Sequence, residues 1–309
     1  MTAVVSASVL ADVGYQSNWI DILSAGFMRN AFIGGSLVAL ASGLIGYFVV
    51  IRRDAFASHA LAHIGFPGAT GAVLIGVPVT LGLAVFCVGG ALAIGALGKR
   101  ADRREVATGT ILAFATALGV LFASLATESA NTVTNVLFGN LLAITSTQLV
   151  TYAVFTAVLV AVLCSIARPL LFASIDPQVA EAKGLPVRAL GVVFMVMLAI
   201  VITMAVQVVG TLLLFALVVT PAATAIAITA RPAAVVALGT AIGLVSVWAG
   251  LVTSAMFNLP PSFPIVSISF AGWLVALAMT RPSRRHAPAS VPPSAHAHDH
   301  PDEPTSLSL

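Results

Sequence analysis

Residues 189–230 read ALGVVFMVMLAIVITMAVQVVGTLLLFALVVTPAATAIAITA and contain no Asp, Glu, Lys or Arg. A helix needs about 20 apolar residues to cross a bilayer, so this stretch is long enough for two crossings. Only QVVG (207–210) separates them, which indicates that one crossing is a short or broken helix buried among other helices. The stretch therefore predicts an all-α membrane protein.

The rest of the chain has the same character. Of its 309 residues, 59% are hydrophobic and only 8% are charged, whereas about a quarter of the residues in soluble domains are charged. This composition predicts a polytopic transmembrane helical bundle of about nine spans, or eight to nine if the broken helix does not cross. The predicted spans are residues 30–51, 56–76, 79–98, 106–126, 147–167, 189–207, 210–228, 233–255 and 265–280.

The basic residues predict the orientation of the bundle. If residues 99–105 (KRADRRE) face the cytoplasm and the spans alternate from there, only Arg29 of the 14 Lys and Arg residues lies outside. Basic residues gather on the cytoplasmic side of membrane proteins. We therefore expect the N-terminus outside and the C-terminus in the cytoplasm.

Three regions follow from these patterns. Residues 1–29 form an N-terminal interfacial segment, in which Trp19 is the expected anchor. Residues 30–280 form the transmembrane domain. Residues 281–309 are rich in Pro, Ser, Ala and His, and we expect a disordered cytoplasmic tail. The chain is thus expected to pass several times through the cell membrane (plasma or inner), in contact with lipid.

The most informative polar residues of the spans are His59 and His63, in FASHALAHIGFPG (56–68), because ionisable side chains inside a membrane are costly and tend to mark pathways. Their i, i+4 spacing puts both imidazoles on one helix face, which suits a shared metal ion or a relayed proton. His63 lies about 15 Å from Arg53 along a helix, near the middle of the bilayer. Alternatively, both are neutral histidines hydrogen-bonded inside the bundle. Two imidazoles do not complete a metal site, and no acidic residue lies in any predicted span.

Small residues at every fourth position predict where helices pack closely. In lipid, helix association depends on such packing rather than on the expulsion of water. The two predicted packing ridges are Gly35/Ala39/Gly43 and Gly68/Ala72/Gly76.

Five segments together form a specific pattern: RRDAFASHALAHIGFPG (52–68), EVATGTILAF (105–114), VLFGNLL (136–142), DPQVAEAKGLPVR (176–188) and QVVGTLLLFALVVTPAATA (207–225). Through them the chain resembles the ABC-type zinc/manganese/iron permease family. The resemblance implies a permease that forms a homodimer, docks a separate cytoplasmic ABC ATPase subunit and receives metal from an extracellular metal-binding solute-binding protein. No cofactor is expected on the chain apart from the transported divalent metal, and no nucleic-acid partner is expected.

The chain departs from the family at two ligand positions. The family has an Asp four residues before the His of its Ser-His-Ala stretch, and aligning Pro-Gly puts His63 on that His and His59 on the Asp. A His pair lacks the hard oxygen ligand, which favours zinc over manganese or iron. Asn258, in Asn-Leu-Pro, replaces a second family Asp. The predicted metal ligands on the translocation route are therefore His59 and His63, with Asn258 as a further candidate.

Two predicted cytoplasmic segments fit energy coupling. Residues 220–232 (TPAATAIAITARP) resemble the family segment that meets the ATPase, and residues 176–188 form a second inner loop that is either a coupling loop or an ordinary connection. No G-x-x-x-x-G-K-[ST] occurs in the sequence, so ATP hydrolysis is expected on a separate subunit and the chain is not predicted to be an enzyme. The predicted coupling residues are Thr220, Pro221, Ala222, Ala223, Thr224 and Arg231.

A proton-coupled secondary transporter that uses the His59/His63 pair is the alternative function, and it would work without an ATPase. A membrane enzyme is disfavoured, because no nucleophile–base arrangement occurs and the spans hold no Asp or Glu. The tail either buffers or senses metal or has no role. Its candidate ligands are His296, His298, Asp299 and His300.

Overall fold

Helices make up all the regular structure of residues 19–97, 101–126, 129–211 and 214–280, which are the residues described in the computed structural model. Seven helices in these ranges are long and apolar enough to cross a membrane. They are α3 (Gly26–Ile51), α5 (Val79–Leu97), α6 (Ala101–Leu125), α8 (Ser146–Ile175), α10 (Val187–Val209), α13 (Pro232–Phe257) and α14 (Ser262–Thr280). The predicted all-α membrane fold is confirmed.

The helix α4 (Ala55–Ile75) has the length of a span but is less apolar, because it contains both histidines and several glycines. It packs against α5, α6 and α10. Its close approach to α5 requires Gly68, where a Cβ would collide with the main chain of Gly82. Likewise, a Cβ at Gly35 or Gly43 of α3 would collide with α13. Gly35, Gly43 and Gly68 of the two predicted ridges therefore lie in packing seams, whereas a Cβ at Gly76 would meet nothing within 4 Å.

The charge-free stretch 189–230 forms three helices rather than two. They are α10, α11 (Leu214–Val218) and α12 (Thr220–Ile228), so the predicted span 210–228 is a pair of short helices. The chain turns at Gly210, where φ is 83°, a conformation that favours glycine. The expected broken helix is thus present, and the main chain beyond α10 is free to pair with another segment.

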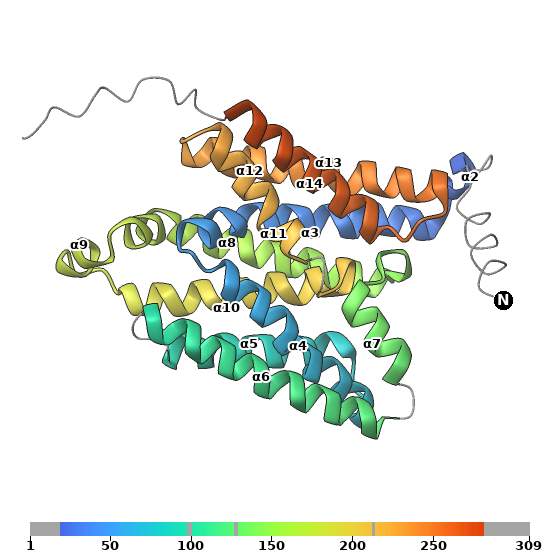
Figure 1. The fold of residues 1–309 in the computed structure, drawn as a ribbon, viewed down its shortest axis with the longest axis horizontal. Helices are drawn as coiled ribbons and strands as arrows, with labels where there is room; N and C mark the ends of the chain where they lie inside the picture. Colours follow the sequence, from blue (N-terminus) through green and yellow to red (C-terminus); the bar gives the residue numbers. More distant parts are fainter. Residues whose placement is uncertain (1–18, 98–100, 127–128, 212–213, 281–309) are drawn as a thin grey trace, which may run out of the picture.

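The bundle has two ends, which we name the α7 end and the α9 end (Figure 1). α7 (Ser129–Phe138) and the short helix α2 (Trp19–Ser24) lie at the first, and α9 (Pro177–Ala182) lies at the second. A 3-10 turn, η1 (Leu141–Ala143), follows α7. Here the chain after α7 meets the break after α10: Asn140 N donates to Gln207 O at 3.0 Å, and Thr211 N donates to Val136 O at 2.9 Å.

Two predicted regions extend beyond the described residues. The N-terminal segment 1–29 is described only from Trp19, the expected anchor, which begins α2. The tail 281–309 lies outside the described residues.

Candidate functional site

The two predicted metal ligands lie on one face of α4. The ring centroids of His59 and His63 are 4.8 Å apart, and the rings meet edge to face at 74°. Both side chains are half-buried, and apart from this ring contact neither forms a hydrogen bond or ion pair within the described residues. The alternative role, as core histidines hydrogen-bonded to the bundle, has no bond to support it there. Imidazoles without other partners can bind a shared cation or pass a proton.

The histidine pair is too small a ligand set for a closed metal site. No cluster of three or more His, Cys, Asp or Glu occurs in the part of the chain that the structure describes, whereas a structural zinc site has about four ligands. A transport site suits few ligands, because it must release its ion. The tail candidates lie outside the described residues: His296, His298, Asp299 and His300.

The other predicted candidate, Asn258, does not join the histidines. It follows the last residue of α13 at the α7 end, whereas α4 begins at the α9 end. Its φ of 51° and ψ of 43° are left-handed, a conformation that Asn tolerates better than most residues. Its main-chain N–H closes the helix by donating to Ser254 O. The cap explains an Asn at this position without a metal.

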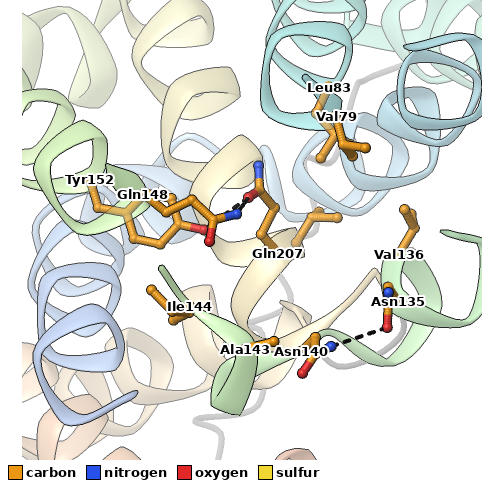
Figure 2. Close-up of a pocket in the computed structure, with 11 residues that line it drawn as sticks. Val79, Leu83, Asn135, Val136, Asn140, Ala143, Ile144, Gln148, Tyr152 and Gln207 are labelled. Carbon is orange, nitrogen blue, oxygen red and sulfur yellow. Dashed lines mark hydrogen bonds between the residues drawn. The ribbon is translucent and has the colours of Figure 1, made fainter. Parts of the chain in front are cut away.

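A polar cavity of about 220 Å³ opens at the α7 end, between α5, α7, α8 and α10. Figure 2 shows that the Gln207 side chain points toward Gln148 and Tyr152, while Asn140 is linked to Asn135. The other lining residues are apolar: Val79, Leu83, Val136, Ala143, Ile144 and Val206. None of the described residues that line the cavity is charged, so the cavity suits water rather than a bare divalent ion, which requires compensating charge.

The Gln207 side chain joins the hydrogen bonds of three neighbouring residues at this cavity. Its side-chain Oε1 accepts hydrogen bonds from Tyr152 OH at 3.0 Å and from Gln148 Nε2 and Thr80 Oγ1 at 3.2 Å each. Its buried Nε2 has no partner among the described residues. These contacts of Gln207 were not predicted, although it is the lone amide side chain in residues 189–230 and an amide in such a stretch is costly without partners.

At the α9 end, the two predicted coupling segments differ in exposure. In 176–188, the α9 side chains of Gln178, Glu181 and the following Lys183 are exposed, whereas Ala180 is buried and holds α9 against the bundle. In 220–232, much of the segment is the packed helix α12. The predicted residues there divide into buried Pro221, Ala222 and Thr224, half-buried Thr220 and Ala223, and exposed Arg231.

The long apolar helices define an integral membrane protein. The chain belongs to the ABC 3 transport family, whose sequence profile matches residues 24–280. The family resemblance read from the five sequence segments is therefore confirmed.

Relatives with known names agree with this assignment. The manganese transport system membrane protein MntC of Listeria innocua is 30% identical over 256 residues, covering 82% of this chain and 91% of that protein. A Haemophilus influenzae membrane protein named for iron transport is 27% identical over 270 residues, covering 85% and 98%. In the solved structure of PsaBC from Streptococcus pneumoniae in complex with Fab, one chain matches with a TM-score of 0.76 and 28% identity, covering 84% and 95%. This chain is a membrane subunit of a metal ABC transport system, and ATP hydrolysis lies on a separate subunit.

Proposed function

We propose that this chain is the permease of an ABC importer for first-row divalent metal ions, and that the ion passes His59 and His63. The observation that carries the proposal is the edge-to-face imidazole pair on α4, in a chain of this family. Imidazole binds such ions, and a pair of them without a closed ligand set can also release the ion.

In this proposal the domain 30–280 crosses the membrane nine times. α4 and the α11–α12 pair add two crossings to the seven apolar helices. The α7 end then faces outside and the α9 end faces the cytoplasm, where Arg52, Lys183 and Arg188 lie, as the distribution of basic residues favours.

Two copies of the permease are proposed to enclose the route, because the described residues of one copy bring only two predicted ligands together. A metal-binding solute-binding protein would deliver the ion at the α7 end. A separate ABC ATPase would dock at the α9 end, mainly on residues 176–188, since these are exposed and the α12 residues are largely buried. Exposed Arg231 is the proposed second contact.

The identity of the metal depends on two considerations that point in different directions. The names of the relatives favour manganese, and one of them is named for iron. The missing carboxylate at position 59 favours zinc, because imidazole suits zinc and hard oxygen ligands suit manganese. Measuring Mn²⁺ and Zn²⁺ in one assay decides between them.

The test is uptake of labelled Mn²⁺ and Zn²⁺ by cells that express the permease with its ATPase and binding protein. His63→Ala should lower uptake of the transported ion by at least about tenfold, the lower range for the loss of metal-site partners. Cys164→Ala, at an exposed position of α8, is the matched control and should transport normally. Unchanged uptake by His63→Ala at equal membrane abundance would remove the histidines from the route.

A further inference from the structure

We infer that Arg52 is the positioning residue that connects loop 176–188 to α4, the helix that carries the histidines, an assignment that rests on the proposed function. Arg52 follows the last residue of α3 and lies in the turn that leads to α4. Its guanidinium contacts groups on both sides of this connection.

On the α4 side, Arg52 Nε donates to Asp54 Oδ2 at 3.3 Å, and the two side chains are only 11% and 3% exposed. Asp54 immediately precedes α4, and its main-chain carbonyl accepts a hydrogen bond from Ser58 N at 2.9 Å. Arg53, between the paired residues, has a φ of 58°, a conformation that few non-glycine residues adopt. The ion pair therefore fixes the position from which α4 starts.

On the loop side, Arg52 Nη1 donates to Ser174 Oγ at 3.2 Å, and Arg52 Cζ lies 4.9 Å from the centroid of the Phe194 ring. Ser174 is in the last turn of α8, just before Asp176, whose carboxylate begins α9 by accepting a hydrogen bond from Val179 N at 3.0 Å. Phe194 is a buried residue of α10. α8 precedes the loop 176–188 and α10 follows it, so Arg52 contacts both of the helices that hold the loop.

The chemistry of arginine suits this connection. A planar guanidinium can bond a carboxylate and a hydroxyl while it stacks on a ring, which a compact ammonium cannot do in the same way. A displacement of α8 or α10 would therefore act on Asp54 and the start of α4. Because α4 is a continuous helix, such a displacement would reach His59 and His63. These residues lie about 8 and 14 Å from Asp54 along the helix axis, at 1.5 Å per residue.

The test separates coupling from stability by measuring two rates. Proteoliposomes that contain the permease with its ATPase and binding protein receive ATP, and Mn²⁺ and Zn²⁺ uptake and ATP hydrolysis are recorded together. In Arg52→Lys, the metal moved per ATP should fall at least about fivefold, the lower range of coupling between sites, while hydrolysis continues. Arg168→Lys, at an exposed position of α8 outside the loop, should change neither rate.

Each other outcome has a definite meaning. If the wild-type complex moves neither ion, the proposed function fails. If the wild type transports but Arg52→Lys keeps its ratio of metal to ATP, or loses uptake and hydrolysis in the same proportion, Arg52 only stabilises the fold and the inference is wrong. If Arg52→Lys does not assemble, Phe194→Leu removes the stacked ring and leaves the ion pair, and the same fall in the ratio is expected.

Discussion

At the scale of single residues, we expect the stability of the fold to depend on one side-chain oxygen atom, Gln207 Oε1. Gln207→Leu removes the acceptor of the buried Tyr152 hydroxyl, whereas half-buried Thr80 and Gln148 can turn to water. A buried donor without a partner costs about 1–3 kcal/mol, so the free energy of unfolding in detergent should fall by that amount. Adding Tyr152→Phe should recover most of the loss, because the buried donor is then gone.

The control for this prediction is Tyr152→Phe alone. Three donors compete for the two lone pairs of Gln207 Oε1, so loss of one should cost less than about 1.5 kcal/mol. Denaturant unfolding of the four proteins gives the coupling between the two residues. If the losses in free energy of unfolding of the two single variants simply add in the double variant, the hydrogen bond between Tyr152 and Gln207 does not stabilise the α7 end.

The histidine pair and Gln207 also show what a sequence reveals about single residues. The facing of His59 and His63 follows from their spacing on one helix, so it was predictable. The partners of Gln207 come from α5 and α8, which lie far from it in the sequence, and no local pattern identifies them. Asn258 is an intermediate case, since its type was noticed but its left-handed cap conformation was not predicted.

At the scale of helices, the contact of α4 with α5 depends on the absence of a side chain. Gly82→Ala would place a Cβ against the main chain of Gly68, and such overpacking costs about 1–3 kcal/mol. Gly89→Ala, on the same helix, meets nothing within 4 Å. It should be neutral or stabilise by up to about 1 kcal/mol, because Ala favours helix over Gly. Thermal unfolding in detergent measures the stability of both variants. Equal changes in stability would contradict a close contact between α4 and α5 at Gly68 and Gly82.

Charge-free stretches located the helices well but not all of their ends. The predicted span 147–167 ends before Arg168, yet α8 continues to Ile175 and contains Pro169. A charge marks where a helix leaves the apolar core and not where its hydrogen bonding stops. Conversely, the break within 210–228 depends on Gly210 and on contacts with the chain after α7, so only its approximate place was predictable.

At the scale of the whole molecule, three polar groups lie at different levels of an apolar bundle. The uncharged cavity lies at the α7 end, the histidine pair on α4, and the Arg52–Asp54 ion pair near the α9 end. The uncharged lining of the cavity suits the arrival of a hydrated ion, and the Arg52–Asp54 ion pair lies between the histidines and the exposed loop. This order fits the proposed importer, in which the ATPase acts at the α9 end and the ion enters at the α7 end.

Such a molecule should move no ion alone. The chain belongs to the ABC 3 transport family, in whose systems ATP hydrolysis lies on a separate subunit, so we expect the free energy of transport to come from that subunit. Purified permease in liposomes should show no Mn²⁺ or Zn²⁺ uptake with or without a proton gradient, and uptake should appear once ATPase, binding protein and ATP are added. An ATPase whose phosphate-binding Lys is replaced by Ala should leave uptake at the level of the permease alone. Uptake by the permease alone under a proton gradient would instead support a proton relay through His59 and His63.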